Sequence, residues 1–274
     1  MSAVLRRVVV ALCVIQFVGI LAVPRAQETP ADGAGAKTWL GKQHEFEEYL
    51  KVAEVVRMQD TVVGVTKPRH AYLAPGGPIG EMAWKALPAS GFKGGYRESY
   101  KTEIAGYEID KLLELNMVPP KVERRLNGTI GVAVMWVVNT KSFKDLGGVP
   151  SSVPPRYRDM WNRQLVRAKM FHNFIGDEDP NLGNWLVDPA WNLILIDHSR
   201  AFSTSKDMVH ELTRIDRDLW DRMKALTEEQ VNTALGPWLD AKQIRAIFER
   251  RDVMQRRIDS LVKKNKGEAD VFVQ

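Results

Sequence analysis

The sequence predicts a mixed α+β protein of two lobes, a small antiparallel-sheet lobe followed by a larger, mainly helical lobe. Short strand-like segments and an Asn127-Gly128 turn occupy the first part of the chain, and Asn-Gly suits the positive φ angles of a tight hairpin. After a Gly- and Pro-rich stretch at 147–155, apolar residues return at helical spacing. The 274 residues are 45% hydrophobic and 27% charged. This ordinary globular composition excludes a disordered, collagen-like or multi-span membrane protein.

The first 26 residues have the order of a secretory signal. Two arginines, Arg6 and Arg7, precede an apolar run at 8–23, and Ala26 follows it. As a helix the run would span about 24 Å at ~1.5 Å per residue, which is short for a hydrocarbon core of ~30 Å. A cleaved signal peptide, an uncleaved membrane anchor and a buried first helix all remain open. The positive flank favours an exported body, in a periplasm or a secretory lumen, or one held at a membrane.

Charge and cysteine content exclude further classes. Lys plus Arg total 39 against 34 Asp plus Glu, but three of the arginines lie in the first 26 residues, where there is no acidic residue. Without that segment the surplus falls to two, so we expect no nucleic-acid partner. The single cysteine, Cys13, lies in the apolar run. The body therefore has no disulfide, no Cys-ligated metal and no Cys nucleophile.

Residues 27–42 have little apolar periodicity and are expected to be a flexible tether. The sheet lobe is expected at 43–140. It would begin with an amphipathic helix at 43–57, which carries Phe46 and Leu50 on one face. Short strands are expected at 61–65, 70–73 and 79–87, a helix at 99–115, and the hairpin at 122–138.

The helical lobe is expected at 141–265. A long helix at 156–174 would be followed by short strands at 185–187 and 193–196 and then by further helices. Two of these helices have clear starts, because Thr227 with Gln230 and Asp240 with Gln243 resemble capping boxes. The last residues, 266–274, are polar and are expected to fray.

Candidate chemistry gathers around residues 175–202. Asp179 and Asn184 lie in the loop after the long helix, and Asp197 ends an apolar strand. Carboxylate and amide oxygens suit Mg²⁺ or Mn²⁺, which bridge phosphate oxygens. Phosphoryl transfer needs a lysine as well, and Lys85, with Glu103 as its partner, could supply it.

Each of these residues also has a structural interpretation. An Asp or Asn near a turn is usually a cap or an Asx-turn residue. Asp177 and Glu178 could take a metal if the register differs by one or two residues. His172 is expected to be a core histidine, and His198 to pack or to bond backbone rather than to ligate metal.

The spacing of these residues resembles a known group. Asp179 is followed five residues later by Asn184, and a short hairpin then leads to Ile196-Asp197-His198 in the place of an Asp-Phe-Gly motif. Residues 62–202 thus resemble the atypical kinases, which include phosphatidylinositol 3-/4-kinases, HipA-type serine kinases and secretory-pathway kinases. They are similar most of all to uncharacterised bacterial members. The resemblance implies a two-lobed protein-kinase-like fold that binds ATP and Mg²⁺ or Mn²⁺.

The resemblance also implies roles by position. Asp179 would be the catalytic base, and Asn184 and Asp197 would hold the metal. Lys85 would bind phosphate with Glu103 as its ion-pair partner. Nucleotide contacts would come from the covering loop at 64–68 and from the linker strand beside the adenine; these residues are Gly64, Val65, Thr66, Met135, Trp136 and Val137.

Two departures from the group's pattern keep alternatives open. Pro180 stands where many relatives have Arg, and Gly64 is the single glycine of the covering loop. The leading hypothesis is a kinase that moves a γ-phosphoryl group to a hydroxyl of a protein, lipid or small molecule. A weak pseudokinase or nucleotide-binding module is the first alternative. A metal-dependent phosphohydrolase or an unrelated binding protein is the second. No sequence pattern indicates the acceptor or the oligomeric state.

Overall fold

The computed structural model describes residues 35–61, 68–90, 98–179 and 181–273. The predicted leader, the first part of the tether, the loop residues Gly64, Val65 and Thr66, and Pro180 lie outside these ranges. Within them, no helix is both long and apolar enough to cross a membrane.

A five-stranded antiparallel sheet forms the first lobe, in the order β1-β2-β3-β5-β4. Its strands are β1 (Val55–Asp60), β2 (Arg69–Leu73), β3 (Glu81–Lys85), β4 (Lys121–Leu126) and β5 (Thr129–Met135). The β4–β5 turn has φ angles of 48° at Asn127 and 81° at Gly128. Two positive φ angles in succession are what a type I′ turn requires, so the predicted hairpin is confirmed.

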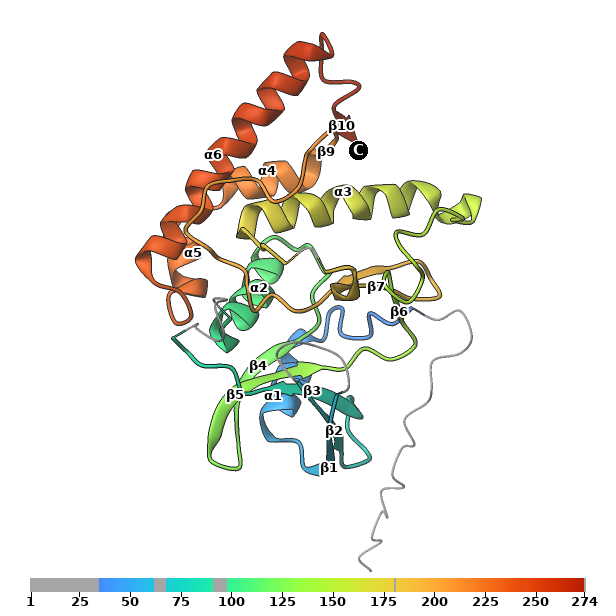
Figure 1. Cartoon of the computed structure of the whole chain (residues 1–274), viewed down its shortest axis with the longest axis vertical. Helices are drawn as coiled ribbons and strands as arrows, with labels where there is room; N and C mark the ends of the chain where they lie inside the picture. The colour runs from blue at the N-terminus through green and yellow to red at the C-terminus, as the bar shows by residue number, and fades with distance from the viewer. Residues whose placement is uncertain (1–34, 62–67, 91–97, 180, 274) are drawn as a thin grey trace, which may run out of the picture.

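Two helices cover opposite faces of this sheet. Helix α1 (Gln43–Val52) packs Phe46 and Leu50 with Met82 and Trp84 of β3. Helix α2 (Tyr100–Leu112) packs Ile104 on the other face and lies between the sheet and the second lobe (Figure 1). Because side chains alternate along a strand, Lys85 points to the α2 face when Trp84 points to the α1 face.

The first helix ends earlier than predicted. Helix α1 stops at Val52, and residues 55–57, expected to be helical, belong to β1. Arg124 of β4 donates to the carbonyl oxygens of Leu50, at 2.9 Å, and Ala53. In a longer helix those oxygens would accept from the backbone N–H groups of residues 54 and 57. The guanidinium therefore caps the helix, and β-branched Val55 and Val56 continue as a strand.

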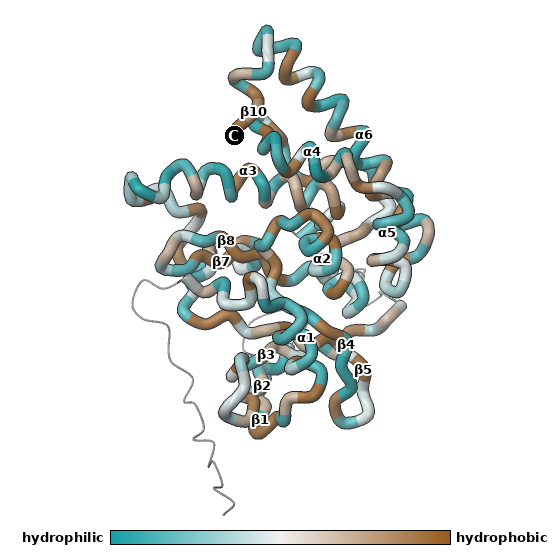
Figure 2. The backbone as a smooth tube through the Cα atoms, turned by 180° about the vertical axis from the view of Figure 1, so that it is seen from behind, coloured by the Kyte–Doolittle hydropathy of each residue, from teal (hydrophilic) through white to brown (hydrophobic). Residues whose placement is uncertain are grey.

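The second lobe is built from helices α3 (Arg158–Ile175), α4 (Arg217–Ala225), α5 (Glu228–Leu235) and α6 (Ala241–Lys264). Both predicted capping boxes are present, at Thr227 and Asp240. The tube alternates between hydrophilic and hydrophobic colours along α6, as an amphipathic helix should (Figure 2). A small sheet of β6 (Lys141–Ser142), β7 (Trp185–Val187) and β8 (Leu193–Leu195) lies beside α3.

Both ends of the described chain are packed, contrary to expectation. Trp39 is buried and the Ala36 N–H donates to Asp188 Oδ2 at 2.6 Å, so residues 36–39 of the expected tether belong to the body. At the other end Val271 is buried, and β10 (Phe272–Val273) pairs in parallel with β9 (Ile215–Asp216). Trp39 and Val271 are single buried apolar residues in polar segments. One such residue creates no hydrophobic periodicity, so the sequence predicted flexible ends.

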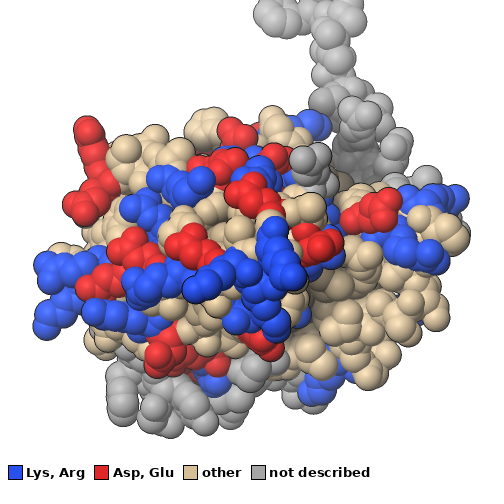
Figure 3. All heavy atoms as spheres, turned by 90° about the horizontal axis from the view of Figure 1, so that it is seen from above, with Lys and Arg blue, Asp and Glu red and all other residues tan. Residues whose placement is uncertain are grey.

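Basic and acidic side chains are interleaved on the face seen from above the helical lobe (Figure 3). Ion pairs of the helical lobe include Arg217 with Glu268 at 2.5 Å and Lys206 with Glu249 at 3.3 Å. The positive surplus of the chain is therefore not gathered into a single-sign patch on this face.

Candidate active site

Lys85, Glu103 and Asp197 meet where the two lobes join. The Lys85 ammonium at the end of β3 donates to Glu103 Oε1 on α2 and, at 2.7 Å, to Asp197 Oδ1 after β8. Glu103 is fully buried and Lys85 is 7% exposed. Three residues that are far apart in the sequence thus form one ionic cluster.

The electrostatics of this cluster keep Lys85 and Glu103 charged. Burial alone would lower the pKa of Lys85, but the carboxylates of Asp197 and Glu103 raise it above its ordinary value. Burial alone would raise the pKa of Glu103, but Lys121 and Lys85 hold it well below its ordinary value. The cluster is therefore an ionic site at neutral pH.

The loop that carries Asp179 is fixed at its start. Helix α3 ends at Ile175, and Gly176 follows in the left-handed region with φ of 61°. A Cβ at Gly176 would lie 2.8 Å from the Arg250 guanidinium carbon, so glycine is needed for both conformation and space. Buried Arg250 donates to the carbonyl oxygens of Phe174, at 3.0 Å, and Ser203, at 2.7 Å. It therefore joins the segment before Asp179 to the segment after Asp197.

Asp179 and Asn184 are neighbours across a single turn. Asn184 Nδ2 donates to Asp179 Oδ2 at 3.3 Å, and the backbone N–H of Asn181 donates to Asp179 Oδ1 at 3.0 Å. The second bond is an Asx-type contact, so the structural interpretation of Asp179 also holds. Because the amide nitrogen of Asn184 faces Asp179, its oxygen Oδ1 remains as the atom suited to a cation.

Asp197 is held in an unusual backbone conformation. Its φ is 60°, which costs a non-glycine residue ~1 kcal/mol or more. Ser199 Oγ donates to Asp197 Oδ1 at 2.8 Å, and the N–H of Ile196 donates to the carbonyl oxygen of Asn184 at 3.0 Å. The second bond holds the backbone before Asp197 next to that of Asn184.

Two cations of the site were missed from the sequence. Lys121, the first residue of β4, is buried and donates to Glu103 Oε2 at 2.5 Å and to His198 Nδ1 at 3.1 Å. Arg200 pairs with Glu98 at 2.7 Å and has its guanidinium 4.0 Å from Asp179 Oδ2. Arg200 places a positive charge beside Asp179, although Pro180 occupies the position where relatives have Arg. The strand alternation could have placed Lys121 on the α2 face, but nothing in the sequence indicates its partner.

The three linker residues differ in where their side chains lie. Met135 and Val137 are buried in the core that includes α1, so their side chains are directed away from the α2 face. Trp136 stacks its ring on His70 of β2, with centroids 4.0 Å apart. Of the three predicted base contacts, only Trp136 therefore has a side chain outside that core.

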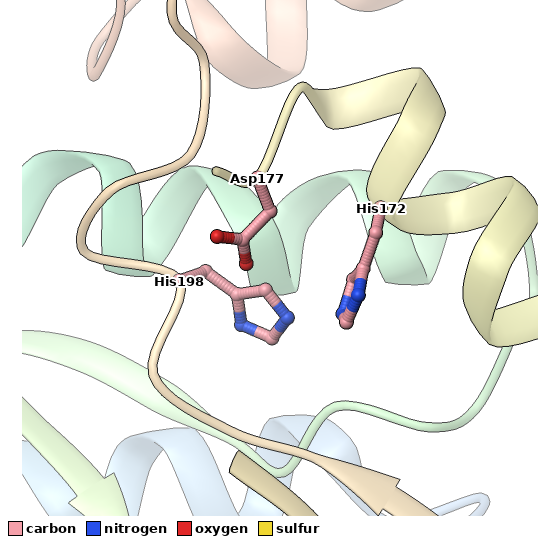
Figure 4. Close-up of side chains that lie close together, drawn as sticks. All are labelled: His172, Asp177 and His198. Atoms are coloured by element: carbon pink, nitrogen blue, oxygen red, sulfur yellow. The ribbon is translucent and has the colours of Figure 1, made fainter. Parts of the chain in front are cut away.

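A second buried polar group is joined to Asp179 by a hydrogen bond from the backbone N–H of Asp179 to Asp177. His172, Asp177 and His198 come from α3, from the loop after it and from the segment after β8, and the Asp177 carboxylate points toward the His198 ring (Figure 4). One potential ligand atom of each lies within 4.8 Å of the others. Burial raises the pKa of Asp177 well above its ordinary value, and burial with the neighbouring His210 lowers the pKa of His172 to about 3.

The contacts of this group favour a structural role. Lys121 donates to His198 Nδ1, so the ring hydrogen is on Nε2, and Nε2 offers no lone pair to a metal. Asp177 Oδ1 accepts the N–H of Asp179 at 3.1 Å, which supports the loop rather than a cation. His198 also packs against α2 at Gly106, where a Cβ would lie 2.9 Å from it. The predictions that His172 is a core residue and that His198 packs agree with these contacts.

Solved structures share this fold, whereas no protein-family model and no curated protein matches the sequence. The hydra Fam20 structure with sugar has a TM-score of 0.63 at 14% identity over 83% of this chain and 90% of its own. The Golgi casein kinase with Mn/ADP bound has a TM-score of 0.62 at 14% identity over 84% and 78%. The Helicobacter pylori proinflammatory kinase CtkA has a TM-score of 0.50 at 11% identity over 77% and 97%.

The chain therefore has a two-lobed α+β fold of the protein-kinase-like type, as predicted. Solved structures that share this fold include Fam20 and the Golgi casein kinase.

Proposed function

We propose that this protein is a kinase that uses ATP and a divalent cation to phosphorylate a hydroxyl group. The observation that carries the proposal is the contact of Lys85 with both Glu103 and Asp197, whose loop is bonded to that of the Asp179–Asn184 pair. A lysine, a base and two oxygen ligands are the parts that phosphoryl transfer requires. The Mn/ADP complex of the Golgi casein kinase fold supports the same choice of nucleotide and metal.

The donor set suits a hard cation. Asp197 offers a carboxylate and Asn184 an amide oxygen, and the backbone bond between their loops keeps them adjacent. Mg²⁺ or Mn²⁺ held by these two residues would neutralise phosphate charge. Lys85 would release Asp197 and donate to the phosphates of ATP.

Asp179 would act as the base. Its carboxylate takes the proton of the acceptor hydroxyl while the hydroxyl oxygen bonds to the γ-phosphorus. The bond from the γ-phosphorus to the bridging oxygen breaks, and ADP leaves. Asn184 and Arg200 orient and stabilise the Asp179 carboxylate. The charge of Arg200 near Asp179 favours an active kinase over a weak pseudokinase, because Arg200 supplies a cation that is missing at position 180, where the residue is proline.

Export is part of the proposal. The leader-like order of residues 1–26 and the fold shared with a Golgi kinase both support it. A eukaryotic secretory lumen contains ATP, whereas a bacterial envelope contains little. Protease treatment of spheroplasts tests export to a periplasm, because an exported body is digested and a cytoplasmic one is protected. Protease treatment of sealed microsomes tests a secretory lumen, because a lumenal body is protected and a cytoplasmic one is digested.

Turnover and binding of the Asp179→Asn variant test the assignment of the base. We expect phosphate transfer from ATP to fall at least ~10²-fold, the usual range for a general base, with the affinity for ADP and Mn²⁺ unchanged. Asp221→Asn, on the exposed face of α4, is the matched control and should behave as wild type. Wild-type transfer by Asp179→Asn would remove the assigned base, and failure of the wild type to bind nucleotide would remove the proposed function.

A further inference from the structure

Two lysines bind the same carboxylate from opposite sides. Lys85 on β3 lies opposite Val132, and Lys121 on β4 lies opposite Val134, so both point to the α2 face on either side of β5. Glu103 of α2 reaches between them. Its Oε1 accepts from Lys85, and its Oε2 accepts from Lys121 at 2.5 Å.

The second partners of the two lysines differ. The second partner of Lys85 is Asp197, whose side chain is 23% exposed and lies at the solvent-accessible edge of the cluster. Lys121 continues inward to His198 Nδ1, and the backbone N–H of His198 donates to Glu103 Oε2 at 3.0 Å. Lys121 and Glu103 are both 0% exposed. Lys85 can therefore change partners on the exposed side of the cluster, whereas Lys121 cannot leave Glu103 without a rearrangement of the core.

We propose that Lys121 is a positioning residue that neutralises Glu103, so that the charge of Lys85 remains available for nucleotide phosphates. The inference rests on the proposed function. Two lysines and two carboxylates balance in the structure as it stands. Once Asp197 turns to the cation, Lys85, Lys121 and Glu103 leave one net positive charge facing the phosphates. Without Lys121, Lys85 and Glu103 cancel, and the phosphate site has none.

Because Lys121→Met changes the net charge that faces the phosphates, it should weaken the binding only of ligands that carry phosphate. Lys121→Met should weaken the binding of ADP with Mn²⁺ by about tenfold, because a unit charge is removed from a poorly solvated site. The binding of adenosine, which has no phosphate, should stay within about twofold, a difference of less than half a kcal/mol. A residue that only supports the fold would change both affinities together.

A second substitution tests whether Lys121 acts through Glu103. In the double variant Lys121→Met with Glu103→Gln, Lys85 again supplies one uncancelled charge. ADP affinity should therefore return to within about threefold of wild type. Lys111→Met is the control and should not change ADP affinity. Lys111 lies on α2, the helix of Glu103, and pairs with Glu47 at 2.8 Å.

Titration calorimetry of the full chain with ADP and Mn²⁺, and with adenosine, measures all of these outcomes. A phosphate-dependent loss in Lys121→Met that Glu103→Gln reverses supports the inference. An unchanged ADP affinity, an equal loss for adenosine, or no reversal in the double variant overturns it and leaves the proposed function standing. If Lys121→Met does not fold, a folded double variant with near wild-type ADP affinity supports the inference, and an unfolded one overturns it. A wild type that binds no ADP overturns the proposed function and the inference with it.

Discussion

Replacement of Glu103 by Gln should destabilise the whole protein. Glu103 is fully buried and faces Lys85 on one oxygen and Lys121 on the other. Glu103→Gln keeps the shape and removes the charge. Lys85 would keep Asp197 as its counter-ion, but Lys121 would remain in the core with only His198 and a neutral amide.

The size of the effect follows from that one uncompensated charge. Breaking a buried ion pair by removal of one partner costs about 3–5 kcal/mol. The Gln oxygen can still accept a hydrogen bond from Lys121, so we expect the lower end, about 3 kcal/mol. For a domain of this size each kcal/mol lowers the unfolding midpoint by ~2–4 °C, so the midpoint should fall by about 6–12 °C.

Thermal unfolding followed by circular dichroism at pH 7 measures this shift. Glu48→Gln is the matched control, because Glu48 bonds Lys51 at 2.6 Å on the exposed face of α1. Its midpoint should not change, since exposed ion pairs contribute little. A fall of less than about 2 °C in Glu103→Gln would refute the buried pairing, because that is under 1 kcal/mol.

Two further predictions concern the loop and the histidine beneath it. Arg200→Met should lower the rate of phosphate transfer by about tenfold or more, because a cation beside the reacting groups is lost; an unchanged rate would contradict its role. Burial lowers the pKa of His172 to about 3, whereas the unfolded chain has about 6.5. Between these values only the unfolded state binds the proton, so stability falls with falling pH, by about 2 kcal/mol at pH 5. His172→Phe should remove this part of the acid sensitivity in urea unfolding at pH 5 and pH 7.5, and an equal loss in both proteins would count against the pKa direction.

Features with short-range causes could be predicted from the sequence. The Asn127-Gly128 turn and the two capping boxes depend on residues within four positions of one another, and all three are present. The pairing of Asp179 with Asn184 is nearly as local, because the two residues are only five positions apart in the sequence.

The rest of the site depends on register between distant segments. Lys121 reaches Glu103 because β4 and β3 both pair with β5 and so face the same helix, and no local pattern encodes this arrangement. Arg200 likewise meets Asp179 only after the two loops fold together. The assignment of Met135 and Val137 as base contacts stays a prediction, and strand alternation places both side chains in the core that includes α1.

The effect of Mn²⁺ on ADP affinity, measured by titration calorimetry for wild type and Asp197→Asn, tests the central claim most directly. Because Asn184 and Asp197 would hold Mn²⁺ against the phosphates, ADP should bind at least ~10-fold more tightly with Mn²⁺ than without it, and Asp197→Asn should lose this gain. Equal ADP affinity with and without Mn²⁺ in the wild type, or a gain retained by Asp197→Asn, would contradict a nucleotide and metal site at this cluster.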